Sequence, residues 1–249
     1  MTDVDGHPGR EDGAPAGAAD GDRLAAAPGR EDHGAPPVVA GPTRKDLQLG
    51  RRLVHLANGV AVASAYALLF THTQVVRVFG TIACLVYVAD RVRILYPELA
   101  ERLPGVNAAF FRAEEQFRES AMTPYVIAIL LTALTFPKTI ALVAILTLAI
   151  ADPLSAVVGI RFGRHRVVPD KSLEGSAAFF AATFAIAFAL LRPLPGVDGL
   201  QAAGAAGLIG LAAAAFEMIP LRLDDNLTIP LLVGFSAWAV CRALGIETP

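Results

Sequence analysis

From residue 47 onward the sequence is divided into apolar segments as long as membrane-spanning helices, and this pattern restricts the fold more than any other feature. We count seven such segments. They cover residues 53–70, 75–90, 121–136, 139–159, 175–191, 199–216 and 227–244. Because about 17–25 helical residues cross the hydrocarbon core of a bilayer, the pattern predicts an all-α, polytopic membrane helix bundle. Some segments are short or interrupted by Pro, Gly or charge, so six or eight spans also fit.

The composition agrees with a membrane protein and excludes several other classes. Hydrophobic residues make up 54% of the chain and charged residues 18%, whereas a soluble domain has about 25% charged residues. The net charge of -2 gives no basic surface for nucleic acid. Cys84 and Cys241 both lie in apolar segments, which excludes a disulfide scaffold and a Cys/His metal cluster.

The first 46 residues differ from the rest in composition. Of the first 42, 23 are Ala, Gly or Pro, and acidic residues are scattered among them. Such a segment cannot bury enough apolar surface to fold alone, and it has neither the basic start nor the apolar core of a signal peptide. We therefore expect a disordered acidic tail over 1–46 and a transmembrane domain over 47–249.

Arg and Lys flank the seven segments unevenly, which predicts the orientation. Fourteen of them fall on the side of the N-terminus and four on the opposite side. Because cytoplasmic loops carry the basic excess, the N-terminus is expected in the cytoplasm. Residues 96–120 mix Phe with Glu and Arg and predict an amphipathic helix at the interface. The excess of Arg over Lys, with abundant Ala and Gly, favours the prokaryotic cell (inner) membrane as the location.

An acidic residue inside an expected span is the first candidate for chemistry. Asp152 lies in the fourth segment and precedes Pro153. An Asp at the centre of a span costs roughly 2.5–3.5 kcal/mol on insertion scales, so it needs a reason. A structural cap on a broken helix and a functional carboxylate both fit this position.

The loop that follows favours a functional role. Arg161, Gly163, Lys171 and Gly175 supply cations and small residues for phosphate oxygens, and Ser172 and Glu174 add a hydroxyl and a carboxylate. Such residue types bind a phosphorylated ligand together with a divalent cation. The alternative, a basic loop that contacts lipid headgroups, remains open for Arg164 and Arg166.

Two more polar clusters lie on the same expected side of the membrane. One combines Glu217 with Asp224, Asp225 and Asn226 before the seventh segment. Capping a helix needs only one of these side chains, so the cluster favours a metal site or a site that activates a hydroxyl. The other cluster, Arg51, Arg52 and His55, begins the first segment and lies on one helical face.

These pieces resemble a family of integral-membrane lipid kinases that includes dolichol kinase, phytol and farnesol kinases and CTP-dependent diacylglycerol kinase. The matching pieces are residues 51–55, Asp152 with 159–165, the sequence Lys-Ser-Leu-Glu-Gly-Ser at 171–176, Glu217, and 224–230. They occur in the expected order over essentially the whole membrane portion. The sequences at 171–176 and 225–230 are the most specific of them.

The resemblance implies that the chain phosphorylates the hydroxyl of a membrane lipid alcohol at the cytoplasmic face. The alcohol would be polyprenol- or dolichol-like, a diacylglycerol or an isoprenoid alcohol, with CTP as donor and Mg²⁺ or another divalent cation. The loop at 159–175 is also similar to one in phosphatidate cytidylyltransferases, which attach CMP to a lipid phosphate. A cytidylyltransferase is therefore the alternative, and a non-catalytic protein that binds membrane lipid is the second alternative.

For that function we expect the following roles of the candidate residues. Arg161 and Lys171 would bind the triphosphate, and Asp152, Glu174 and Asp225 would hold the metal. Asp224 or Asp225 would orient or deprotonate the lipid hydroxyl. The remaining candidates are Arg52, His55, Gly163, Ser172 and Gly175 for phosphate, with Glu217 and Asn226 as further members of the site.

Overall fold

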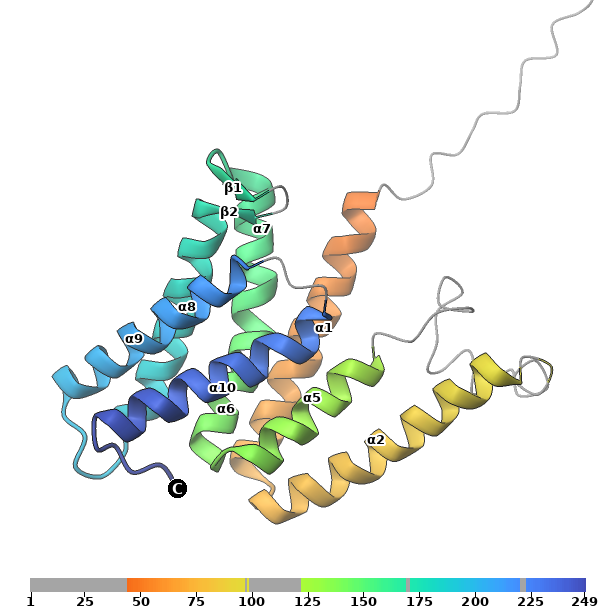
Figure 1. Ribbon diagram of the computed structural model, residues 1–249, viewed down its shortest axis with the longest axis horizontal. Helices are drawn as coiled ribbons and strands as arrows, with labels where there is room; N and C mark the ends of the chain where they lie inside the picture. Colours follow the sequence, from red (N-terminus) through yellow and green to blue (C-terminus); the bar gives the residue numbers. More distant parts are fainter. Residues whose placement is uncertain (1–43, 97, 99–121, 169–170, 220–222) are drawn as a thin grey trace, which may run out of the picture. The chain divides into compact units, whose positions relative to one another are not determined.

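The computed structural model describes residues 44–96, 98, 122–168, 171–219 and 223–249, and Figure 1 labels its elements. For residues 44–49 and 51 it describes the backbone only. The expected acidic tail, up to residue 43, and nearly all of the expected interfacial helix at 96–120 lie outside the described residues. Both stay predictions.

All seven apolar segments form helices. The first three give α1 (Arg44–Leu68), α2 (His72–Leu95) and α5 (Met122–Thr135). The fourth is a continuous helical run made of α6 (Lys138–Leu146), the π-helix η2 (Thr147–Ala151) and α7 (Asp152–Phe162). The last three give α8 (Leu173–Leu191), α9 (Gly199–Glu217) and α10 (Asp225–Ala243). The predicted helical class is confirmed for the described residues, apart from one short hairpin.

Four of the helical runs are long and apolar enough to cross a membrane. They are Lys138–Phe162, α8, α9 and α10. Helix α5 is apolar but has only 14 residues, and α1 and α2 do not reach the same apolarity. The structure therefore indicates a membrane protein, while the number of seven crossings and the cytoplasmic N-terminus stay predictions.

The helices pack around one apolar core. Helix α8 packs against α7 and α9, while α10 packs against α9, α5 and α6 (Figure 1). Helix α2 packs along α5, and α1 lies against η2 and α6. Ile129, Phe179, Ile209 and Val233 are almost fully buried between these helices. Because this packing fixes how each helix is rotated, it also fixes which polar residues at the helix ends face one another.

A glycine permits the close contact between α1 and the π-helix. A Cβ atom at Gly59 would overlap the side chain of Ala149 in η2. A larger residue would therefore push α1 away from η2. This contact matters for the site because Asp152 follows η2 directly.

A two-stranded hairpin joins α7 to α8. Strands β1 (Arg166–Val168) and β2 (Lys171–Ser172) are antiparallel, with Arg166 opposite Ser172 and Val168 opposite Lys171. The side chain of Ser172 then accepts a hydrogen bond from the backbone N–H of Gly175 and caps α8. The hairpin thus holds Lys171 at the N-terminal end of α8.

Candidate active site

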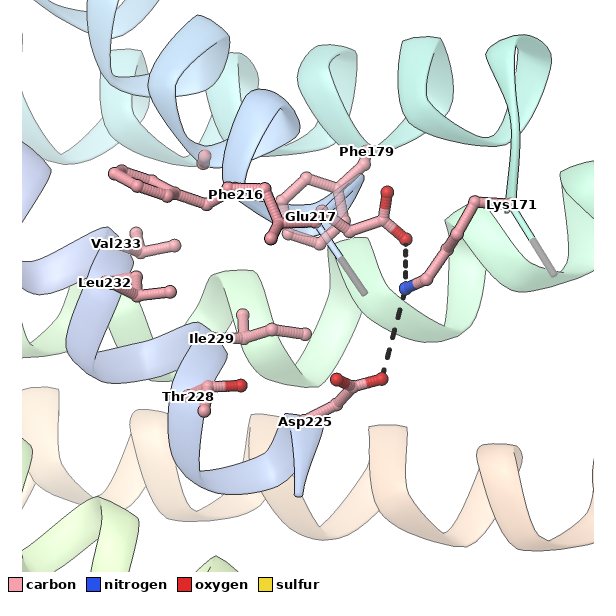
Figure 2. A pocket seen from close by; sticks show the side chains of 11 residues that line it. Lys171, Phe179, Phe216, Glu217, Asp225, Thr228, Ile229, Leu232 and Val233 are labelled. Carbon is pink, nitrogen blue, oxygen red and sulfur yellow. Dashed lines mark hydrogen bonds and ion pairs between the residues drawn. The ribbon is translucent and has the colours of Figure 1, made fainter. Parts of the chain in front are cut away.

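Lys171 is the centre of the candidate site, because carboxylates from two helices lie beside its ammonium (Figure 2). Its Nζ donates a hydrogen bond of 2.6 Å to Oε1 of Glu217, the last residue of α9. The same Nζ lies 3.9 Å from Oδ2 of Asp225, the first residue of α10. The hairpin, α9 and α10 therefore meet at this lysine.

The two carboxylates differ in exposure and in the number of their partners. The Glu217 side chain is 4% exposed, and its second oxygen accepts a 3.1 Å hydrogen bond from the hydroxyl of Ser176. The Asp225 side chain is 59% exposed. Glu217 is thus held by two donors inside the bundle, whereas Asp225 faces solvent and can reach a ligand.

Asp152 lies near this group because of the π-helix. In η2 the N–H of Asp152 donates to the carbonyl of Thr147, five residues earlier. Pro153 has no N–H and cannot make the usual bond to the residue four positions before it. The wider π turn accommodates this break and rotates the following helix. Asp152 then lies close enough to Asp225 and Lys171 for their charges to act on its carboxylate.

The electrostatics of the cluster favour a charged lysine. Burial would lower the pKa of the Lys171 ammonium, but its hydrogen bond to Glu217 and the carboxylate charges of Glu217, Asp225 and Asp152 outweigh burial. The pKa of Lys171 therefore lies above its ordinary value. A cation held in this way suits the binding of phosphate oxygens.

Helix α1 contributes the basic residues expected near the first span. The charge of Arg52 acts on the carboxylate of Asp152. His55, one turn further along, packs edge-on against Tyr125 of α5, with ring centroids 5.0 Å apart. Arg52 thus joins the Asp152 side of the cluster, while the ring of His55 packs against Tyr125 of α5.

Glu174 contacts a different group from the one the sequence predicts. Its carboxylate accepts hydrogen bonds from the backbone N–H of His165 and lies 2.8 Å from Nδ1 of the same residue. Residues two apart on a helix point in nearly opposite directions, so Glu174 faces away from Ser176. In this arrangement Glu174 holds the start of the hairpin, and the structure does not bring it together with Lys171.

The expected phosphate-binding glycines lie at a close contact between α7 and α8. A Cβ at Gly163 would clash with Ser172, and a Cβ at Gly175 would lie 2.9 Å from the carbonyl oxygen of Ser155. Both glycines are therefore needed for packing around Ser172. Arg161 lies exposed on the last turn of α7, with its guanidinium 5.6 Å from the ring centroid of Phe162.

The paired aspartates before the last helix have different surroundings. Asp224 is the N-cap of α10, and its carboxylate accepts a 2.8 Å hydrogen bond from the N–H of Asn226. Asp225 instead faces Lys171. Of the two residues that could act on a hydroxyl, the geometry places Asp225 in the cluster, while Asp224 and the backbone of Asn226 begin the helix.

The Lys171 cluster forms one end of a pocket between α8, α9 and α10. Thr228, Asp225, Glu217 and Lys171 line the polar end. The other lining residues are apolar: Phe179, Ala213, Phe216, Ile219, Ile229, Leu232 and Val233. Figure 2 shows the apolar side chains of α9 and α10 on the side away from Lys171. The lining of the pocket therefore has one polar end, while the rest of it is apolar.

Comparison with curated proteins finds relatives that match parts of this chain. An uncharacterized protein of Rickettsia prowazekii is 33% identical over 115 residues, which cover 46% of this chain and 55% of that protein. A phytol kinase of Synechocystis is 35% identical over 102 residues, which cover 40% of this chain and 43% of the kinase. The chain is thus similar to a phytol kinase over part of its length.

A third relative matches more of the chain at lower identity. It is an uncharacterized protein of Methanocaldococcus jannaschii, 26% identical over 194 residues, which cover 76% of this chain and 91% of that protein. The chain spans about half the length of the first two relatives. No family model matches the chain, and no solved structure matches it significantly.

The carboxylates near Lys171 could hold a metal only together with oxygens from a ligand. Among the described residues, no three His, Cys, Asp or Glu side chains are grouped so that they could hold a metal ion. Mg²⁺ at phosphate sites is usually held by one or two carboxylates together with substrate oxygens. Asp152 and Asp225 supply such a pair, and Glu174 does not join them.

Two features of this site had little signal in the sequence. Ser176 lies within the 171–176 piece, but nothing in its spacing shows that its hydroxyl donates to Glu217, 41 residues away. The apolar wall of the pocket consists of residues that are ordinary in a membrane span. The one signal for this contact in the sequence was Ser176 itself, a polar residue two positions after Glu174 inside the apolar run of α8.

Proposed function

We propose that the chain is a kinase that transfers the γ-phosphoryl group of CTP to the hydroxyl of a membrane lipid alcohol. The observation that carries this proposal is Lys171, held between a buried and an exposed carboxylate at the polar end of an otherwise apolar pocket. The partial similarity to a phytol kinase supports the same class of acceptor. CTP as the donor comes from the family resemblance of the sequence.

In the proposed reaction Asp225 acts as the general base, because it is the exposed carboxylate beside Lys171. It accepts the proton of the lipid hydroxyl while the alcohol oxygen bonds to the γ-phosphorus. The bond between that phosphorus and the bridging oxygen breaks, and CDP leaves with the electron pair. Lys171 binds phosphate oxygens, and Glu217 keeps its ammonium in place.

A divalent cation completes the proposed site. Asp152 would hold Mg²⁺ together with one oxygen of Asp225, while the other oxygen of Asp225 accepts the proton. The metal would neutralise charge on the phosphate oxygens when it is bound. Arg52 is a second cation on the Asp152 side of the cluster and adds to the attraction for the triphosphate. Glu174 acts at a distance by holding the hairpin that carries Lys171.

The position of the label in the product tests this function. Purified full-length protein in lipid nanodiscs receives CTP labelled at the γ or at the α phosphate, with Mg²⁺ and a panel of lipid alcohols or phosphatidate. We expect lipid phosphate that carries the γ label, and loss of that product in Lys171→Ala. Label from the α phosphate alone would identify a cytidylyltransferase instead. Equal product from wild type and Lys171→Ala would contradict the proposed site.

A further inference from the structure

The pocket beside Lys171 changes from polar to apolar along the helix axes. Asp225 begins α10, Glu217 ends α9, and Lys171 precedes α8. All three polar residues therefore lie at the same end of these helices. The apolar lining lies further inside them: Leu232 is seven residues beyond Asp225, about 10 Å deeper along the helix at 1.5 Å per residue.

This change from polar to apolar lining has the same direction as the change from the polar surface of a bilayer to its hydrocarbon core. Helices α8, α9 and α10 are long and apolar enough to span the membrane, and their polar ends would lie at its surface. A lipid alcohol in a bilayer has its hydroxyl at the surface and its chain in the core. It could therefore enter such a pocket sideways without turning over.

Exposed apolar side chains border the pocket between α9 and α10. Phe216 is 38% exposed and Ile219 48% exposed, although both line the pocket. On α10, Leu232 is half-buried and lies one turn beyond Thr228 on the same face. These residues would contact a ligand on one side and lipid on the other, which suits the point where a chain enters.

We propose that a single hydrocarbon chain of the lipid alcohol binds between α9 and α10, in a subsite formed by Phe216, Leu232 and Val233. This inference rests on the proposed function for the identity of the acceptor. Ala213 and Phe179 also line this pocket, and both are almost fully buried. The hydroxyl then lies at the polar end, within reach of Asp225, and the size of residue 232 selects among chains.

Photocrosslinking tests the location directly. The probe is a long-chain alcohol that carries a diazirine several carbons from the hydroxyl, added to the full-length protein in nanodiscs without nucleotide. We expect the crosslinked peptides to contain residues 213–219, at and just after the end of α9, or residues 228–233 of α10. We also expect unlabelled alcohol to compete for this labelling. Labelling elsewhere, or labelling that CTP but not alcohol displaces, would overturn the proposal.

Substitution of Leu232 tests whether this subsite selects the chain. Leu232→Trp fills the subsite and should reduce crosslinking about tenfold, the change that 1.4 kcal/mol produces. Leu211→Trp is the matched control, because Leu211 lies on α9, is 62% exposed and does not line the pocket. Equal effects of the two variants would overturn the proposal. If Leu232→Trp does not fold, Leu232→Ala should shift preference toward bulkier, branched chains, and an unchanged preference would overturn it.

Parallel assays separate this inference from the proposed function. Pocket labelling without phosphate transfer from CTP would support the chain subsite and contradict the kinase. Phosphate transfer with labelling outside the pocket would support the kinase and overturn the subsite.

Discussion

Lys171 lies between two carboxylates that differ in burial and in the number of their hydrogen bonds. Glu217 already accepts from Lys171 and Ser176, so both of its oxygens are engaged. Asp225 lies 3.9 Å from the same ammonium and is mostly exposed. The buried carboxylate therefore positions the lysine, and the exposed one remains able to accept a proton from a substrate.

The two neighbouring aspartates should respond differently to the same substitution. Asp225→Asn removes the proposed base, and kcat should fall by about 10²–10⁴-fold, the usual contribution of general base catalysis. Asp224→Asn keeps an N-cap side chain and should change kcat little. Thermal unfolding of both variants serves as the folding control. A larger loss of kcat in Asp224→Asn than in Asp225→Asn would contradict the assignment.

Glu217→Gln should change the pH profile of the proposed reaction. The raised pKa of Lys171 keeps its ammonium charged to higher pH than in a free lysine, and Glu217 is its hydrogen-bonded partner. Without that carboxylate, less opposes the lowering effect of burial, and the pKa of Lys171 falls. The alkaline limb of kcat/KM should therefore move to lower pH in Glu217→Gln. An unchanged limb would show that the charge of Lys171 does not limit the reaction.

The same ion pair makes a pH-dependent contribution to folding stability. Because the pKa of Lys171 is higher in the folded chain than its ordinary value, this contribution is complete at neutral pH. It is lost only as the pH rises above the ordinary lysine pKa and through the folded value. Near neutral pH, small changes of pH therefore do not change the contribution of Lys171 to the free energy of unfolding.

At the scale of the elements, the site depends on how closely α1 approaches η2. Gly59→Leu would place side-chain atoms where Ala149 lies, so overpacking should lower the free energy of unfolding by about 1–3 kcal/mol. The displaced η2 would also move Asp152 and reduce activity. Gly207→Leu is the matched control, because a Cβ at Gly207 of α9 meets no atom within 4 Å. Thermal unfolding and activity of both variants check this, and equal losses would contradict it.

The helices could be predicted from the sequence because each apolar run has the length that a span requires, or nearly that length. The contacts at their ends could not, because they depend on helix rotation. Glu174 and Ser176 are two residues apart and point to opposite sides of α8, so it is Ser176 that reaches Glu217. Whether Asp224 or Asp225 faces Lys171 depends on the residue at which α10 begins. That boundary is set by local capping.

At the scale of the whole molecule, the proposed chemistry requires the hairpin and the polar helix ends to face the cytoplasm, where CTP is found. The basic residues of the loops predict this orientation. Four helical runs have the length and apolarity to span the membrane. Helix α8 separates the hairpin from the segment at 192–198, so these two regions should lie on opposite sides.

Cysteine labelling in sealed vesicles checks the orientation. In a Cys84→Ser background, Val167→Cys in the exposed hairpin should react with an impermeant maleimide from the cytoplasmic side only. Pro195→Cys, in the exposed segment between α8 and α9, should react from the opposite side only. Labelling of both positions from one side would contradict a spanning α8, and the reverse pattern would contradict the predicted cytoplasmic site.

The π-helix also limits how the chain can change in length. A π turn holds one more residue than the α-helical turn it replaces, so deletion of one residue from Thr147–Ala151 would restore regular winding. The helix before the deletion would keep its place in the core, and Asp152 would rotate by about 100° away from Lys171. A relative that uses the same carboxylate must therefore keep the extra residue, or carry its aspartate one position away. An alignment of full-length relatives would show the second case as a one-residue gap in this segment together with an aspartate shifted by one position.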